Sequence, residues 1–295
     1  MKTGGLVAFS LCLLAQASFA GEAPWIISLK SPEVLQGGVV EIKVLGGDLA
    51  RVKGLSRNQE IPFFPREDRS YAALLGVDLE ERPGPMGITI KVSSKGGKKR
   101  ERLITLNVRK RVFPQESLSV SAAYDRIDEA TRRRIEKEQA QIARLWAISS
   151  PRRLWEGRFL APVPGKITSP FGLRRIINGS PRSSHGGVDL RASLGTEVVA
   201  ANHGRVVLRE EFFFSGKSIV LDHGGGLYTM YFHLADFRVK KSSRVLKGDL
   251  IGWAGMTGRV TGPHLHWGVR LNGARVDPLE FLEAVGNRRA MGKRE

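Results

Sequence analysis

The stretch Thr261-Gly262-Pro263-His264-Leu265-His266-Trp267 places two histidines two residues apart in a run typical of a β-strand. Side chains along a strand point to opposite faces in turn, so His264 and His266 share one face and Leu265 takes the other. Two imidazoles side by side on a sheet suit a metal site, a proton-transfer site, or both. The stretch therefore predicts a β domain with a chemical site on one face.

Two upstream segments carry matching side chains. His185-Gly186-Gly187-Val188-Asp189 holds a histidine and a carboxylate four residues apart, and Tyr231-Phe232-His233 holds a further histidine. Catalytic zinc takes three protein ligands and keeps a fourth position open, and two histidines with one carboxylate supply such a set. Two remaining histidines beside it could transfer protons at neutral pH. We interpret the three segments as one site.

The chain around these segments, from Phe159 to about Glu283, consists of short apolar runs between glycine and aspartate turns. Asn272-Gly273 lies between two such runs and is a strong hairpin signal. The strand that carries His264 and His266 should therefore return on itself. We expect a compact antiparallel β domain with long glycine-rich loops, and we place it at residues 159–283.

Residues 21–112 also have strand character. Val39 to Val44 alternates apolar and charged residues over most of its length, and Ile88 to Val92 alternates throughout. Glycine and proline turns separate these runs, which suggests a small β-sandwich. The region shows no polar constellation that could do chemistry, so its expected role is binding, positioning or covering the second domain.

Residues 113–158 differ in character. Tyr124 to Ile148 is rich in charge, and Ile127, Thr131, Ile135, Ile142 and Leu145 recur at helical spacing. This pattern predicts a linking α-helix that packs on one domain. We interpret residues 284–295 as a basic tail.

The N-terminus predicts export. A short start with one positive charge precedes an apolar stretch from Leu6 to Ala20 that ends in small residues, which is typical of a signal peptide comprising residues 1–20. No later run is long and apolar enough to span a membrane, so we expect no transmembrane segment after cleavage. The one cysteine is Cys12, inside the signal, so the mature chain can form no disulfide and no cysteine-ligated zinc site. These features favour the periplasm or cell envelope of a bacterium.

The charge balance indicates anionic partners. Of 47 basic residues, Lys2 leaves with the signal, so 46 remain against 29 acidic residues, a net charge of +17. For an exported protein, anionic wall polymers or lipid head groups are better partners than nucleic acid. We predict no nucleic-acid binding, because the chain has no recognisable motif for it, and the run Arg132-Arg133-Arg134 is best explained as a solvated helix face.

Residues Phe159 to about Glu283 resemble the lysostaphin-type (LytM-like) zinc metalloendopeptidases, which cut peptide cross-links in bacterial cell wall. Six pieces in the family's order carry the resemblance: Ser169-Pro170-Phe171-Gly172, His185-Gly186-Gly187-Val188-Asp189-Leu190, Gly195-Thr196-Glu197-Val198-Val199-Ala200, Asp222-His223-Gly224, Tyr231-Phe232-His233-Leu234 and Gly258-Arg259-Val260-Thr261-Gly262-Pro263-His264-Leu265-His266. A histidine and an aspartate at this spacing are a weak signal alone, and two alternate histidines a moderate one. The six pieces together are specific.

The resemblance implies roles for five residues. His185 and Asp189 match the family's first two zinc ligands, and His266 matches the third. His264 matches a catalytic histidine that is often treated as the general base. His233 matches the other catalytic histidine, which helps to orient water or to stabilise the tetrahedral intermediate.

One feature departs from many relatives. Phe232 occupies a variable position where a smaller residue is common, and it could crowd the groove and alter substrate choice. Relatives that lack the five residues act as non-enzymatic activators, whereas this chain keeps all five. His203 and His223 lie next to glycines, and we expect them to lie outside the site.

The predicted chain is thus mainly β, with an N-terminal small β-sandwich, a linking α-helix and a C-terminal antiparallel β metallopeptidase domain that binds one Zn²⁺. The resemblance implies a zinc metalloendopeptidase that hydrolyses peptide bonds in peptidoglycan stem peptides or cross-bridges during cell-wall remodelling. The alternative is a non-catalytic envelope regulator that binds peptidoglycan or activates a wall hydrolase. Retention of all the ligand positions argues against that alternative.

Overall fold

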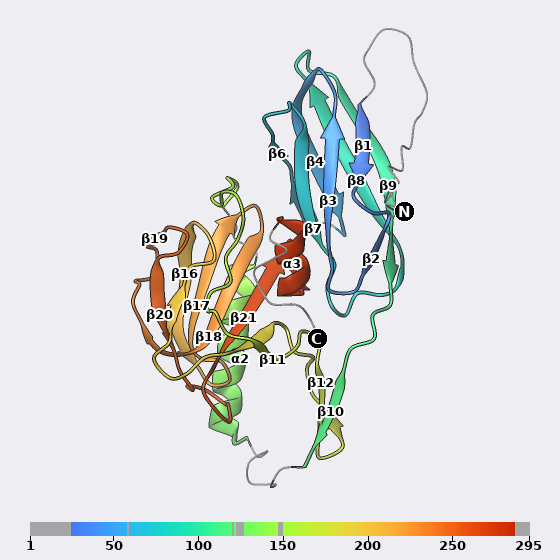
Figure 1. Cartoon of the computed structure of the whole chain (residues 1–295). Helices are drawn as coiled ribbons and strands as arrows, with labels where there is room; N and C mark the ends of the chain where they lie inside the picture. Colours follow the sequence, from blue (N-terminus) through green and yellow to red (C-terminus); the bar gives the residue numbers. More distant parts are fainter. Residues whose placement is uncertain (1–24, 58, 120, 122–126, 147–149, 287–295) are drawn as a thin grey trace, which may run out of the picture.

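The computed structural model of the chain describes residues 25–57, 59–119, 121, 127–146 and 150–286. The predicted signal peptide and most of the predicted basic tail lie outside these residues. Within them the chain forms four β-sheets and two helices, with the N-terminal strands gathered in one unit and the C-terminal strands in another (Figure 1). The expectation of a mainly β fold is confirmed. No helix among the described residues has the length and apolar character needed to cross a membrane.

The N-terminal unit is a sandwich of two sheets. The first sheet has the order β1 (Ile26–Leu29), β3 (Val39–Leu45), β7 (Tyr71–Gly76) and β6 (Phe64–Pro65). The second has the order β2 (Glu33–Leu35), β9 (Lys99–Arg109), β8 (Gly84–Ser94), β4 (Leu49–Ser56) and β5 (Gln59–Pro62). Alternate residues of both sheets, among them Ile42, Val44, Ile88, Ile90 and Leu106, are buried in one shared core. The sandwich expected from the alternating runs is therefore confirmed.

The C-terminal unit is built on a ten-stranded sheet in which every pairing is antiparallel. Its main path runs β11 (Ile167–Ser169), β14 (Val188–Arg191), β21 (His264–Leu271), β18 (Leu227–Phe237), β17 (Gly216–Gly224), β16 (Gly204–Phe212) and β19 (Arg244–Val245). Attached to this path are β15 (Glu197–Val199), β20 (Leu250–Ala254) and β22 (Ala274–Val276). The predicted hairpin joins β21 to β22, and Asn272 and Gly273 adopt the positive φ values that a tight two-residue turn requires.

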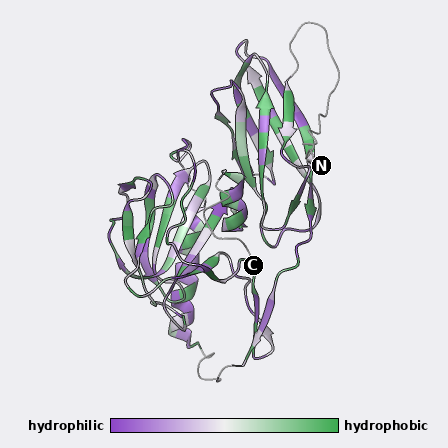
Figure 2. Ribbon diagram, in the orientation of Figure 1, coloured by the Kyte–Doolittle hydropathy of each residue, from purple (hydrophilic) through white to green (hydrophobic). Residues whose placement is uncertain are grey.

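The linking helix is α2 (Glu129–Leu145). The side chain of Asp128 caps it by accepting a hydrogen bond from the backbone N–H of Thr131 at 2.7 Å. Ile135 is the buried residue of the helix, and Ile142 and Leu145 pack against the C-terminal sheet. Most of its remaining surface is hydrophilic (Figure 2), which agrees with the charged face expected from the sequence. The ends of the predicted helical stretch, residues 124–126 and 147–148, lie outside the described residues.

The structure adds a strand that the sequence pattern did not indicate. Within the expected helical linker, β10 (Gln115–Leu118) pairs in parallel with β12 (Arg174–Ile177), which continues to β13 (Ser180–Pro181). All four residues of β10 are exposed. Glu116 of β10 also pairs with Arg175 of β12 at 3.3 Å, but no residue of β10 is buried, so the strand leaves no apolar alternation in the sequence.

The two units pack against each other through polar and apolar contacts. Arg275 of β22 pairs with Asp78 at 2.7 Å, and Arg111 pairs at 2.7 Å with Asp277. Asp277 also caps α3 (Pro278–Ala284), which lies beside the sandwich (Figure 1). A Cβ added at Gly37 of the sandwich would collide with the Phe171 ring. The sandwich is therefore docked on the C-terminal unit rather than tethered to it loosely.

Candidate active site

Three neighbouring strands, together with the loop before β14 that carries His185, bring the predicted site residues together. On β14 and β21, Asp189 lies directly opposite His266, and on β21 and β18 His266 lies opposite Phe232. Leu265 is fully buried in the core, while His264 and His266 are half-buried on the other face. This placement follows from the two-residue period of a strand and agrees with the expectation from the sequence.

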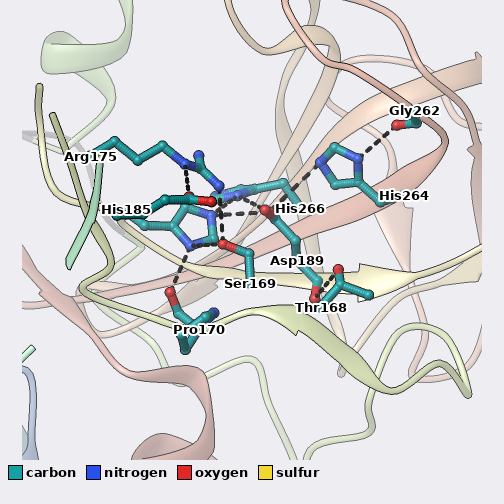
Figure 3. Close-up of polar contacts among 10 residues, drawn as sticks. Thr168, Ser169, Pro170, Arg175, His185, Asp189, Gly262, His264 and His266 are labelled. Carbon is teal, nitrogen blue, oxygen red and sulfur yellow. Dashed lines mark hydrogen bonds and ion pairs between the residues drawn. The ribbon is translucent and has the colours of Figure 1, made fainter. Parts of the chain in front are cut away.

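Three side chains form a compact cluster of ligand atoms (Figure 3). The Nε2 atom of His185 lies 3.0 Å from Oδ1 of Asp189 and 2.9 Å from Nδ1 of His266. That Nδ1 atom lies 3.0 Å from the same Asp189 oxygen. Two nitrogens and one carboxylate oxygen thus form a nearly equilateral triangle, so a single cation could be held by all three.

The backbone orients the first of these ligands. The Pro170 carbonyl oxygen lies 2.8 Å from Nδ1 of His185, so this nitrogen carries the proton and donates it (Figure 3). The Nε2 atom of the neutral ring then presents its lone pair to the cluster. The Ser169 hydroxyl lies 3.4 Å from the same Nδ1 and accepts a hydrogen bond from Arg175 at 3.3 Å.

The charge state of the cluster follows from its contacts. Burial alone would raise the pKa of Asp189, but its contacts with His185 and His266 outweigh burial and hold that pKa well below the ordinary value. Burial lowers the pKa of His266. Near neutral pH the cluster therefore contains an ionised carboxylate and an uncharged His266 ring.

His233 enters from β18 at an irregular point of the strand. Phe232 still pairs with β21, whereas Leu234 pairs with Ala254 of β20, and His233 between them adopts φ +65°. A non-glycine residue in this region is strained and must be held by its surroundings. Burial, reinforced by the neighbouring His266, lowers the pKa of His233 to about 4, so its ring is neutral near pH 7.

His264 lies between His233 and the cluster. Its ring centroid is 4.9 Å from that of His233, and its Nε2 atom is 3.7 Å from Oδ1 of Asp189. Its Nδ1 atom donates to the Gly262 carbonyl at 2.9 Å (Figure 3). Both His233 and His264 therefore border the cluster without belonging to its triangle of ligand atoms. All five residues singled out in the sequence are brought together in this site.

Phe232 and α2 form the surroundings on one side. The Phe232 ring stacks on His266 at 5.3 Å with 5° between the planes, so this side chain lies against the cluster itself. Tyr228 and Arg270 are paired on the same sheet face, and both contact Trp146 at the end of α2. Arg270 is four residues beyond His266, roughly 14 Å along the strand. Helix α2 therefore covers part of the face that carries the site.

The other two histidines lie elsewhere. His223 is fully buried and bonds through its two ring nitrogens to the His203 carbonyl and the Thr229 hydroxyl, both at 2.7 Å. Sequence reasoning left both histidines outside the site. It missed the carbonyls that orient the site. These are the carbonyls of Pro170 and Gly262 and that of Thr257, which accepts a hydrogen bond from Nδ1 of His233 at 3.0 Å. Every residue has a carbonyl, so no residue type marks the ones that are used.

Comparison with known proteins gives three results. The model of peptidase family M23 matches residues 183–278. The peptidoglycan DD-endopeptidase ShyA of Vibrio cholerae is 38% identical over 122 residues, which are 40% of this chain and 28% of that protein. The DD-carboxypeptidase/endopeptidase Mpg of Neisseria meningitidis is 37% identical over 114 residues, 39% of this chain and 26% of that one. This chain thus matches little more than a quarter of the length of either relative.

A solved structure extends the similarity beyond the site. The crystal structure of a Pseudomonas aeruginosa protein described as an M23 peptidase superimposes with a TM-score of 0.67 at 31% identity. The superposition covers 85% of this chain and 95% of that one, so it includes the sandwich as well as the C-terminal sheet. A matching family model over the site, together with this similarity over almost the whole of a solved relative, shows that the chain belongs to peptidase family M23.

Proposed function

We propose that this chain is a zinc-dependent endopeptidase that hydrolyses peptide bonds in peptidoglycan stem peptides or cross-bridges. The observation that carries the proposal is the triangle of donor atoms from His185, Asp189 and His266, with sides of 2.9–3.0 Å, bordered by two further histidines. We assign metal binding to the three members of the triangle and proton transfer to His233 and His264.

The residues fit zinc. Donors about 2.0–2.2 Å from a tetrahedral zinc ion lie roughly 3.3–3.6 Å apart, a few tenths of an ångström wider than the separations in the triangle. The Pro170 carbonyl fixes the His185 tautomer so that Nε2 can ligate, and the carboxylate supplies one negative charge. Three protein ligands leave a coordination position open, as in catalytic rather than structural zinc sites. A bound zinc ion would supply polarisation of the scissile carbonyl and acidification of water.

The two bordering histidines would handle protons. Because Nδ1 of each donates to a carbonyl, Nε2 is the nitrogen of each ring that is free to contact water or substrate. His264, whose Nε2 is 3.7 Å from Asp189, is the nearer to the triangle, and we assign it the role of general base that accepts a proton from the attacking water. His233, held uncharged by burial, would accept a hydrogen bond from the attacking water through Nε2.

Substrate and location follow from the relatives and the charge. Two of the matched proteins are named as DD-endopeptidases or DD-carboxypeptidases, the first of them of peptidoglycan, and we extend peptidoglycan to this chain as its substrate. The net charge of +17 after signal cleavage would favour anionic wall polymers or lipid head groups nearby, in the periplasm or cell envelope.

The test is zinc content together with release of soluble muropeptides from purified cell wall. About one zinc per chain and chelator-sensitive release would support the proposal. Binding to wall without release, by a folded and zinc-loaded protein, would instead favour the non-catalytic regulator.

A further inference from the structure

One loop contacts both proton-transfer histidines. Residues 256–263 connect β20 to β21, and two of their carbonyl oxygens accept hydrogen bonds from imidazoles. Nδ1 of His233 donates to the Thr257 carbonyl at 3.0 Å, and Nδ1 of His264 donates to the Gly262 carbonyl at 2.9 Å. A carbonyl can only accept, so each ring carries its proton on Nδ1, and Nε2 is left as the reactive nitrogen.

The base of this loop is closed by the backbone. Gly255 and His264 form an isolated antiparallel bridge, with the His264 N–H donating to the Gly255 carbonyl at 3.2 Å. At the far side the Arg259 N–H donates to the Phe214 carbonyl at 3.0 Å. The loop is thus attached both to the strand that carries His264 and to the hairpin between β16 and β17.

The Thr257 hydroxyl is the side-chain anchor of the loop. It accepts a hydrogen bond from the Lys217 N–H at 2.9 Å and donates one to the Leu234 carbonyl at 2.8 Å. Leu234 follows His233 directly, so the hydroxyl ties the loop to the next residue along the same strand. The carbonyl of the same threonine accepts the hydrogen bond from Nδ1 of His233. Thr257 therefore contacts the His233 ring through its carbonyl and the backbone next to His233 through its hydroxyl.

Close backbone packing also holds the loop against the hairpin between β16 and β17. A Cβ added at Gly216 would collide with Thr257, and one added at Gly258 would collide with the backbone of Phe214 and Gly216. The N–H of His233 donates to the Ser215 carbonyl of the same hairpin at 2.9 Å. The strained left-handed backbone of His233 is therefore over-determined by groups that also hold the loop.

We infer that loop 256–263 is a single positioning element for both proton-transfer histidines, and that Thr257 is its positioning residue. The inference rests on the proposed function for its kinetic consequence, because it assigns His233 and His264 their tautomers and directions within that site. Thr257 itself touches neither metal nor substrate in this scheme and acts through His233.

The kinetic test compares two substitutions in the full chain. Thr257→Val keeps the shape but removes both hydroxyl bonds, whereas Thr257→Ser keeps them. With a soluble cross-linked muropeptide as substrate, Thr257→Val should lower kcat about 10- to 100-fold, as misplacement of a catalytic group does, with KM within about twofold and zinc content unchanged. Thr257→Ser should stay within about threefold of wild type. Thr105→Val, at an exposed threonine of β9, controls for the chemical change.

A double-mutant cycle separates positioning from general damage. If Thr257 acts through His233, Thr257→Val should cause no further loss of activity in a His233→Ala background. An equal loss in both backgrounds, or wild-type kcat in Thr257→Val, would overturn the inference.

A spectroscopic test needs no activity. In zinc-loaded protein labelled with ¹⁵N-histidine, NMR should show His233 and His264 protonated on Nδ1, and Thr257→Val should disturb the His233 signals that Thr257→Ser preserves. A proton on Nε2 of either ring in the wild-type protein refutes the inference. Failure of the wild-type protein to release muropeptides would instead refute the proposed function and leave the NMR result to decide on the loop.

Discussion

Replacement of Gly187 by alanine should weaken zinc binding without touching a ligand. A Cβ built on Gly187 would lie 2.7 Å from Nε2 of His266, and closer still to the Trp267 carbonyl oxygen. That oxygen belongs to β21, which is hydrogen-bonded to β14 on one side and β18 on the other, so it has little freedom to move. The His266 ring must therefore move, and the backbone at Gly187 must also shift to clear the Trp267 oxygen.

The size of the effect follows from this overlap. Nonbonded atoms of this kind need about 3.5 Å, so the separation between the Cβ and the ring must grow by roughly 0.8 Å. Ligand distances in a metal site tolerate only about ±0.2 Å, and His266 supplies one of three donor atoms. We expect zinc affinity to fall about 10- to 100-fold, the usual range for disturbed ligand orientation, or about 1.4–2.8 kcal/mol.

The adjacent glycine offers a matched control. A Cβ on Gly186 would meet only Cδ of Arg275 at 3.7 Å, an ordinary contact, and neither glycine adopts a positive φ. Zinc affinities of wild type, Gly186→Ala and Gly187→Ala can be measured by competition with a chelator, with thermal unfolding as a check on folding. Equal affinity in folded Gly187→Ala and Gly186→Ala would refute this account of how His266 is placed.

Three further predictions address roles, pH and access. Asp189→Ala should lose zinc and activity together, whereas His233→Ala should keep about one zinc per chain and lose activity by roughly two to four orders of magnitude; metal analysis beside wall hydrolysis checks both. Burial lowers the pKa of His223 from 6.5 to about 4. As the pH falls, the unfolded chain therefore binds a proton at this residue before the folded chain does, and the free energy of unfolding should drop by about 3 kcal/mol between pH 6.5 and 4. Denaturant unfolding should show a smaller drop in His223→Gln, and an unchanged one would exclude this cause. Ile142→Asp should loosen α2 and speed hydrolysis of intact wall relative to a short soluble peptide; an unchanged ratio would mean that α2 does not limit access.

Much of the fold could be predicted because it rests on side-chain alternation. The runs around Ile42 and Ile90 alternate because one face of each strand is buried between two sheets, and such burial is written into the sequence. The Asn272-Gly273 turn could also be predicted, because few residue types adopt its positive φ values. β10 could not be predicted from alternation, since all four of its residues are exposed. The domain boundaries assigned from composition remain predictions.

The sequence predicted the residues of the site but not the groups and conformations that hold them in place. Histidines and a carboxylate at recognisable spacings mark the chemistry, and the structure brings them within one cluster and its border. The left-handed backbone of His233 could not be predicted from the sequence, because histidine, although enriched among non-glycine residues with positive φ, adopts other conformations far more often. The stacking of Phe232 on His266 was likewise unseen, although the position had been noted as a departure from relatives.

Backbone carbonyls orient three of the four histidines of the site. At His185, His233 and His264 a backbone carbonyl accepts a hydrogen bond from Nδ1, so Nε2 is the nitrogen that faces the site. At His266 Nδ1 itself faces the cluster, at 3.0 Å from Asp189. Spacing along a strand fixes the face that a ring occupies, but the direction of each lone pair depends on a carbonyl contributed from another segment. The same carbonyl contact occurs at His185, a proposed metal ligand, and at His233 and His264, the proposed proton-transfer residues. The loops therefore determine which nitrogen of each of these rings is free, whereas position relative to the triangle of donor atoms determines which rings could bind a metal ion.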